Sequence, residues 1–270
     1  SLHGMGANLG EMLGPITVAG ILSLLLWRDV LKFSSIPAIL IGFVIWASIH
    51  SLQGNENSGI TSVGDYKTSI KALLKNRVLL VLVLAVALRA IGESAITVFL
   101  PVLLREELRY SSSRVAIYLT SSRLAGLASQ PIMGFLSDRF GRKAILSPAT
   151  ALTSLLAFGL IIAEPGIQLL IIIIANGAFG FALHHIFVAA AIDASRGSLQ
   201  STVVSLIYGA GVIAVFSPYV AGIIADRWGI DGAFIYGGTV LILPVLLLLS
   251  VQIPRQDTIP DTTPTGLDRR

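Results

Sequence analysis

The sequence predicts an all-α membrane protein, on the strength of three observations. Of its 270 residues, 54% are hydrophobic and only 13% are charged, and the mean hydropathy is +0.82. A soluble domain carries about 25% charged residues, because a globule must cover itself with polar groups. The third observation is eight apolar runs of about 20 residues, long enough to cross a bilayer, whereas strands rarely exceed about ten. These predicted spans are residues 4–26, 34–51, 78–104, 113–136, 144–163, 167–191, 200–225 and 232–252.

One long connection divides the predicted spans into two groups. Residues 52–77 are rich in Gly, Asn and Ser and then become basic, whereas the other connections are short. We therefore expect two spans in residues 1–51 and six in residues 78–252. Residues 253–270 hold three prolines among polar residues and are predicted to be a disordered tail. The chain opens on Ser1 without a signal peptide, and we expect it to be a fragment.

The distribution of Lys and Arg predicts the orientation in the membrane. Successive connections alternate sides, and one side holds eleven of these residues against six on the other. Because the cytoplasmic side carries the excess, we expect residues 52–77, the fourth-to-fifth connection and the tail to be cytoplasmic. The expected location is a prokaryotic inner membrane, with the lipid bilayer as the first partner.

Composition and missing motifs exclude several classes of function. The net charge is +4, and the positive residues lie in short segments between apolar runs. There they indicate the orientation of the chain in the membrane, so no nucleic-acid partner is expected. The chain has no Cys, which excludes a disulfide framework, a thiolate metal site and a Cys nucleophile. It also lacks a phosphate-binding Gly-Lys-Ser/Thr loop, a nucleophile elbow and a metal-spaced His/Glu set. We therefore expect no enzyme activity, no cofactor and no metal.

An eight-residue pattern occurs twice in the sequence. Both copies read Gly, two hydrophobic residues, a small residue, Asp-Arg, an aromatic residue and Gly. The two Asp residues are 226 − 138 = 88 positions apart, a distance of three spans, which places the copies on opposite sides of the membrane. Such a pair is typical of an inverted repeat of three helices, the alternative being chance recurrence at helix ends. The matched positions are Gly134, Asp138, Arg139 and Gly141 with Gly222, Asp226, Arg227 and Gly229.

The first copy carries a family resemblance. Residues 134–143, GFLSDRFGRK, resemble the loop signature G-x-L-[SA]-D-R-x-G-R-[KR] of the major facilitator superfamily, in which it lies between helices two and three and again between eight and nine. We expect Gly134 to permit a close helix approach and Gly141 a tight turn. Asp138 can cap the next helix or neutralise its N-terminus. The basic residues that would keep this loop cytoplasmic are Arg139, Arg142 and Lys143; a generic basic loop is the alternative.

A second pattern opens the chain. Residues 6–15, GANLGEMLGP, place Gly6, Gly10 and Gly14 on one helix face, followed by Pro15. The pattern is similar to the fifth-helix motif of the superfamily's proton-coupled antiporters, although a plain packing face is the alternative. The resemblance covers essentially the whole chain and implies helices five to twelve of twelve. It implies a bundle of eight transmembrane helices, with residues 78–252 as a complete six-helix half and residues 1–51 as two helices of the other half.

Four charged residues lie well inside predicted spans, away from the span ends, where ionisable groups are costly and are functional candidates. Arg89 lies about 18 Å from Arg77, near the midplane, and Glu93 follows one turn later. The two form either a self-neutralised structural pair or a site in which Arg89 attracts an anionic group and Glu93 exchanges a proton. Arg123 and Glu11 have similar estimated depths and are predicted to form an ion pair between the two halves.

Three polar residues in the sixth span are further candidates. Asn176 is placed to hydrogen-bond a substrate, although Gly177 and Gly180 beside it can instead mark a packing face. His184 and His185 point about 100° apart on a helix. One of them can relay protons, or both can be inert at the interface.

The sequence therefore predicts a secondary transporter of a small molecule working by alternating access. Proton coupling is expected, and the glycine-proline pattern favours export by antiport over uptake. Arg89, Arg123 and Glu93 sum to +1, which favours an anionic substrate or an acidic partner elsewhere. A non-transporting sensor or scaffold on the same fold is the second hypothesis, and an intramembrane enzyme is the third. The full-length protein is expected to be monomeric.

Overall fold

Every described element of the protein is helical. The computed structural model describes residues 24–52, 75–195 and 200–253, with scattered positions before residue 24, and no strand occurs in these ranges. A π-helical turn, η1 (Leu103–Glu107), and a 3₁₀ segment, η2 (Gly211–Phe216), interrupt the helices. The α-helices are α2 (Trp27–Leu52), α4 (Arg77–Val102), α5 (Ser112–Phe140), α6 (Arg142–Ile162), α7 (Ile167–Ala194), α8 (Gln200–Ala210), α9 (Ser217–Trp228) and α10 (Ile230–Leu249).

The predicted membrane class is confirmed. Six described helical stretches are long and apolar enough to span a bilayer, namely Trp27–Ser48, Arg77–Glu107, Arg142–Ile162, Ile167–Ala194, Gln200–Trp228 and Ile230–Leu249. The 29-residue α5 is long enough as well, but it carries several Ser residues and Arg123 and is not among the six. Most of the first predicted span, residues 4–26, lies outside the described residues. The total of eight spans therefore stays a prediction.

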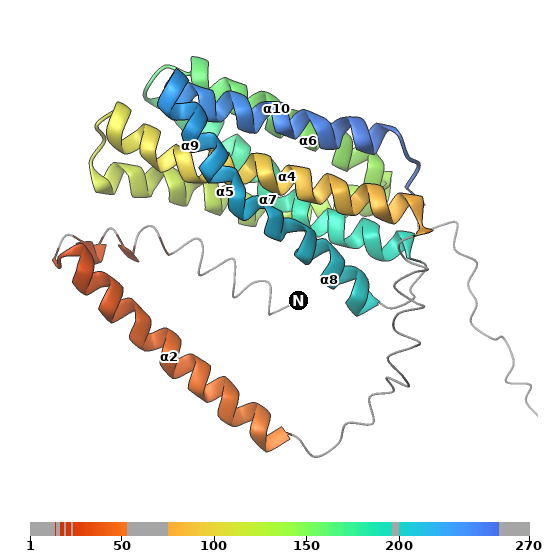
Figure 1. The fold of residues 1–270 in the computed structure, drawn as a ribbon, viewed down its shortest axis with the longest axis horizontal. Coiled ribbons are helices and arrows are strands. Elements are labelled where there is room, and N and C mark those ends of the chain that lie inside the picture. Colours follow the sequence, from red (N-terminus) through yellow and green to blue (C-terminus); the bar gives the residue numbers. More distant parts are fainter. Residues whose placement is uncertain are drawn as a thin grey trace, which may run out of the picture.

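Helix α2 begins earlier than predicted. It starts at Trp27 and not near residue 34, so Arg28 and Lys32 belong to its first turns. Asp29 lies near the positive end of the helix dipole and accepts a hydrogen bond from Lys32 at 3.3 Å. Only 6% of the apolar stretch of α2 is buried, and the helix stands apart from the bundle formed by the other helices (Figure 1).

The repeat seen in the sequence reappears in the helix boundaries. Helix α5 runs from residue 112 to residue 140, and the segment formed by α8, η2 and α9, which we call the α8–η2–α9 rod, runs from residue 200 to residue 228, 88 positions later at each end. The helices that follow, α6 and α10, begin at residues 142 and 230, again 88 positions apart. Each copy turns on a glycine with positive φ, 96° at Gly141 and 78° at Gly229, a backbone region in which other residues are strained. Gly141 is the single residue between α5 and α6.

The two glycine turns lie at opposite ends of the bundle. Gly229 precedes α10, whereas Lys143, just after Gly141, donates hydrogen bonds to the carbonyls of Leu249 and Val251 at the far end of α10. A 20-residue helix separates its ends by about 30 Å. We call the end where α4 begins and α10 ends the inner end, and the opposite one the outer end; in Figure 1 the turn between α9 and α10 lies at the outer end.

Small residues set how closely the helices pack. Helix α4 packs on α10 and on the α8–η2–α9 rod, and α7 packs on α5 and α6. A Cβ added to Gly92 of α4 would lie 2.8 Å from the carbonyl oxygen of Gly237 of α10, so only glycine permits this backbone contact. Buried apolar clusters fill both ends, with Leu82 and Phe187 in one and Ile173 in the other.

Candidate functional site

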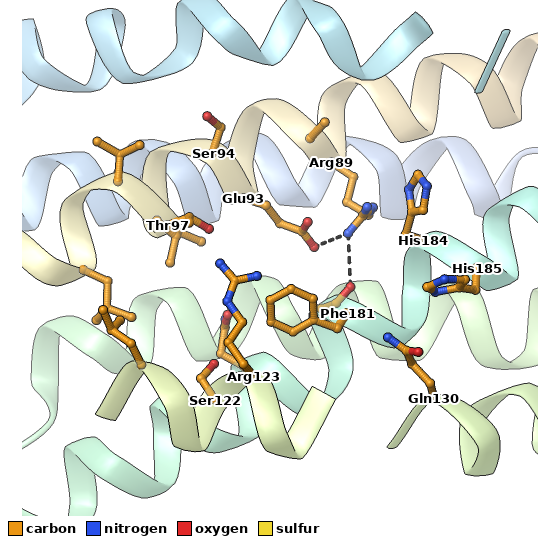
Figure 2. Close-up of a pocket in the computed structure, with 17 residues that line it drawn as sticks. Arg89, Glu93, Ser94, Thr97, Ser122, Arg123, Gln130, Phe181, His184 and His185 are labelled. Atoms are coloured by element: carbon orange, nitrogen blue, oxygen red, sulfur yellow. Dashed lines mark hydrogen bonds and ion pairs between the residues drawn. The ribbon is translucent and has the colours of Figure 1, made fainter. Parts of the chain in front are cut away.

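A cavity of about 440 Å³ lies between α4, α5 and α7. Arg89, Glu93, Asn176, His184 and Arg123 all line it, as does His185, so the structure brings together six residues that the sequence singled out. Figure 2 shows the charged groups facing one another from α4 and α5. The remaining polar side chains in the wall are Ser94, Thr97, Ser122 and Gln130, and apolar side chains include Ile96, Leu100 and Leu119.

Arg89 and Glu93 form an ion pair on one face of α4. A terminal nitrogen of Arg89, Nη1, donates to Oε1 of Glu93 and to the carbonyl of Gly180 on α7 at 3.3 Å. The guanidinium lies 5.8 Å from the ring centroid of Phe187. The side chain of Arg89 is 5% exposed and that of Glu93 is 28% exposed. Arg89 is therefore held in the wall between α4 and α7, while the Glu93 carboxylate reaches the cavity.

Arg123 approaches the same carboxylate from α5. Its guanidinium lies 4.3 Å from the ring centroid of Phe181 on α7, a cation–π distance, and it interacts electrostatically with Glu93. Figure 2 shows Arg123 rising from α5 towards Glu93 and Thr97. One carboxylate thus lies in the field of two guanidinium groups. Glu11, the predicted partner of Arg123, lies outside the described residues, and that ion pair stays a prediction.

Two glycines create the close crossing of α5 and α7 beside the cavity. A Cβ on Gly126 would lie 2.5 Å from Cδ2 of Phe181, and one on Gly177 would lie 2.2 Å from the Ser122 carbonyl oxygen. Gly177 therefore marks a packing face, one of the alternatives left open by the sequence. Gly126 gives Phe181 the room to lie against Arg123. Neither Gly126 nor Phe181 could be identified from the sequence, because nothing in the local pattern pairs them.

The histidines occupy different surroundings. His184 is partly buried and contacts the Tyr208 ring of α8 edge-on at a centroid distance of 4.8 Å, whereas His185 is exposed. Nε2 of His184 has no hydrogen-bond partner among the described residues. Across these residues, no three His, Asp or Glu side chains gather to hold a metal ion.

A second polar constellation lies at the inner end. Arg142, the first residue of α6, pairs with Asp138 of α5 and donates through Nε to Asp193 of α7 at 2.9 Å. The side chains of Arg142 and Asp193 are each 11% exposed. Asp193 was not predicted; an acidic residue ending an apolar run opposite a basic loop is the signal that could have identified it. In the second copy, Ile230 stands where Arg142 stands in the first.

Two expectations for the loop motif, a cap on α6 by Asp138 and a close helix approach at Gly134, are not met among the described residues. No side chain caps α6, whose N-cap is Gly141, because Asp138 pairs instead with Arg142 one turn later. A Cβ added to Gly134 would meet nothing within 4 Å among the described residues, and one on Gly222 would meet only the tip of Phe99, at 3.9 Å. The close contacts are at other glycines, which the motif does not contain.

The other residues of the two motif copies make few contacts among the described residues. Arg139 is exposed and lies over the Phe140 ring, and Asp226 and Arg227 are exposed at the outer end. In the glycine-proline pattern, a Cβ on Gly14 would meet no described atom within 4 Å. Gly6, Gly10 and Pro15 lie outside the described residues, so that pattern stays a prediction.

Comparison with known proteins identifies relatives. A family model described as Major Facilitator Superfamily matches residues 82–267. Two proteins named multi-drug resistance efflux pump PmrA, from Streptococcus pneumoniae serotype 4 and from strain R6 of the same species, are each 27% identical over 161 residues. The match covers 58% of this chain and 40% of each relative, so the chain spans less than half of their length.

Proposed function

The chain belongs to the major facilitator superfamily, and from that premise we propose that it acts in secondary transport of a small solute by alternating access. The observation that carries the proposal is the charged cavity. Its volume of about 440 Å³ falls within the range of small-molecule sites. Arg89 is the thirteenth of the 26 residues of α4, so it lies at the middle of this helix. Charge at that depth is costly to retain without a function.

The proposed working unit is the six-helix half, residues 78–252. Alternating access rocks one rigid half against the other, and three contacts at the inner end support rigidity within this half. Asn76 donates to the Ala194 carbonyl at 2.9 Å, Arg142 joins α6 to α7, and Lys143 joins α6 to the last residue of α10. Residues 1–51 would supply two helices of the other half, residues 52–77 the cytoplasmic connector and residues 253–270 a cytoplasmic tail.

Proton coupling is proposed to act through Glu93, the carboxylate that lines the cavity. Export is favoured over uptake on two grounds: the glycine-proline pattern of residues 6–15, and the similarity to pneumococcal proteins that are named efflux pumps. Those relatives are bacterial, which supports a plasma-membrane location. Asn176 and His184, also in the cavity wall, are proposed substrate or proton contacts.

The test is proton flux in liposomes that contain the purified full-length protein and a pH-sensitive dye. A panel of anionic, neutral and cationic aromatic solutes should include at least one that drives flux, and Glu93→Gln should abolish that flux. Glu107→Gln is the matched control, since Glu107 is exposed in η1 at the outer end and does not line the cavity. Binding without flux for every solute would reject transport by this chain and favour the sensor hypothesis.

A further inference from the structure

Two buried polar atoms in the wall of the cavity have no hydrogen-bond partner among the described residues, namely Nε of Arg89 and Nε2 of His184. We propose that these two atoms bind a hydroxyl group of the solute, which accepts a hydrogen bond from Arg89 and donates one to His184. The inference rests on the transport function proposed above and adds a chemical group that the solute carries. It concerns binding, so it can be tested whether or not flux is observed.

The face of α7 that packs on Arg89 brings His184 next to the guanidinium. The Gly180 carbonyl accepts a hydrogen bond from Nη1 of Arg89 at 3.3 Å, and the Phe187 ring centroid lies 5.8 Å from the guanidinium. Residues 180, 184 and 187 follow the i, i+4, i+7 spacing of one helix face, so His184 lies between these two contacts. His184 also interacts electrostatically with Arg89, and Figure 2 shows the two side chains next to each other.

Arg89 supplies a hydrogen-bond donor that needs a neutral acceptor. Its side chain is 5% exposed, and its Nη1 is occupied by the Glu93 carboxylate and the Gly180 carbonyl. The N–H group at Nε stays unpaired, which is costly for a buried donor. Because Glu93 already balances the charge of Arg89, a neutral oxygen satisfies this N–H group without placing a second negative charge beside the carboxylate.

His184 supplies the matching acceptor. A neutral imidazole has one N–H group and one acceptor nitrogen, and beside a guanidinium the favourable arrangement turns the lone pair, and not the N–H group, towards the positive charge. The favoured tautomer therefore carries its proton on Nδ1 and its lone pair on Nε2. A group that binds both atoms must accept from Arg89 and donate to His184. A hydroxyl group does both, whereas a carbonyl or ether oxygen only accepts and an ammonium group only donates.

Access to the two atoms needs a small movement of His184. Both atoms are covered in the described conformation, although both side chains line the cavity. The His184 ring meets the rings of Tyr208 and His185 edge-on. The hydroxyl group therefore enters as the His184 ring turns about its Cβ–Cγ bond.

The apolar part of the wall defines the rest of the solute. Ile96, Leu119 and the Phe181 ring line the cavity together with the polar groups. Such a wall favours an aromatic or branched aliphatic body. The proposed solute is therefore an alcohol or a phenol with an apolar body.

The experiment compares three uncharged aromatic probes that differ in hydrogen bonding. The hydroxyl group of β-naphthol donates and accepts, its methyl ether only accepts, and β-methylnaphthalene does neither. Phenolic hydroxyl groups ionise at about pH 10, so β-naphthol is neutral in a buffer at about pH 7. Each probe is equilibrated by dialysis with the full-length protein in uncharged detergent micelles. Protein-free micelles measure the part of each probe that dissolves in the detergent.

The proposal expects β-naphthol to bind at least about tenfold more tightly than β-methylnaphthalene. The methyl ether should fall between them, because it accepts from Arg89 but leaves Nε2 of His184 without a donor. This comparison needs no substitution, so it holds even if a variant fails to fold. Equal affinity for the three probes overturns the proposal and assigns the two atoms to a buried water molecule, which offers the same donor and acceptor.

His184→Phe keeps a ring at this position but removes its nitrogens. In this variant β-naphthol should lose its advantage over the methyl ether. Tyr208→Phe is the matched control, since Tyr208 contacts His184 but does not line the cavity, and it should keep the full preference for β-naphthol. A preference that survives His184→Phe, or that disappears equally in Tyr208→Phe, overturns the role of His184.

Arg89→Lys keeps a positive charge opposite Glu93 but removes Nε. It should weaken the binding of β-naphthol and of its methyl ether and leave that of β-methylnaphthalene unchanged, whereas an equal loss for all three probes overturns the role of Arg89. Preference for β-naphthol without flux in liposomes would reject transport alone. Flux of solutes that lack a hydroxyl group, together with equal binding of the three probes, would reject this inference alone.

Discussion

Gly177→Ala is the perturbation whose outcome the structure determines most directly. Gly177 lies where α7 crosses α5, and the added Cβ would be 2.2 Å from the Ser122 carbonyl oxygen and 2.7 Å from its carbonyl carbon. These atoms belong to the backbone and cannot move aside by changing a rotamer. Because ordinary contacts begin at 3.4 Å, the two helices must separate locally by about 3.4 − 2.2 = 1.2 Å.

The expected loss follows from that displacement. Overpacking a close-packed interior costs roughly 1–3 kcal/mol, and separating α5 from α7 also removes contacts around the crossing, so we expect about 3 kcal/mol. A domain of this size loses about 2–4 °C of melting temperature per kcal/mol. Gly177→Ala should therefore melt about 6–12 °C below the unmodified chain. The same separation would displace Ser122 and Arg123, which line the cavity.

The assay is thermal unfolding in detergent, and Gly134→Ala is the matched control. Gly134 also lies in a membrane helix, but a Cβ there would meet nothing within 4 Å among the described residues. In a helix interior, Ala is favoured over Gly by up to about 1 kcal/mol, so the control should melt at or slightly above the unmodified temperature. If Gly177→Ala and Gly134→Ala melt together, the close crossing of α5 and α7 does not exist.

Two further predictions concern the inner end. Arg142→Gln and Asp193→Asn should each lower stability by about 1–3 kcal/mol, because each leaves a largely buried partner unpaired; the double variant should lose less than the sum, as measured by a double-mutant cycle on thermal unfolding. Additive losses would show that the pair is not coupled. Asn76→Ala should cost about 1 kcal/mol, since its side chain caps α4. Asn76→Asp keeps the cap but cannot donate to Ala194, so it should lose less, and an equal loss would assign the whole effect to the contact with Ala194.

Helices, charges and turns were the features that the sequence could predict. Lipid-spanning helices are long and apolar, so seven of the eight predicted runs overlap described helical segments over most of their length. The positive φ at Gly141 follows from the tight turn that two adjacent helices require. Arg89 and Glu93 could be paired from their spacing alone, because residues four apart share a helix face.

The sequence could not predict which residues make contacts between helices. A membrane helix is apolar on every side, so periodicity does not reveal which face meets a neighbour. This explains why Gly134 was expected at a close approach that actually occurs at Gly177 and Gly126. It also explains why Asp193 and Phe181 were missed, because each acquires its role from a residue on another helix, Arg142 and Arg123 respectively.

The inverted repeat makes one further prediction, about sidedness. Phe140 and Trp228 are equivalent positions, since 140 + 88 = 228, and both are exposed, by 50% and 70%. The structure places them at opposite ends of the bundle, and the excess of Lys and Arg predicts that Phe140 faces the cytoplasm. The chain contains no Cys, so Phe140→Cys and Trp228→Cys each introduce a single thiol without changing the charge.

A membrane-impermeant maleimide applied to intact cells should label the thiol at position 228 and reach position 140 only after permeabilisation. The unmodified chain is the control for background labelling. Labelling of both positions from one side would contradict the inverted repeat, because three crossings must separate them. Labelling of position 140 alone in intact cells would preserve the repeat but reverse the orientation, and would place the Arg142–Asp193 pair on the outer face of the membrane.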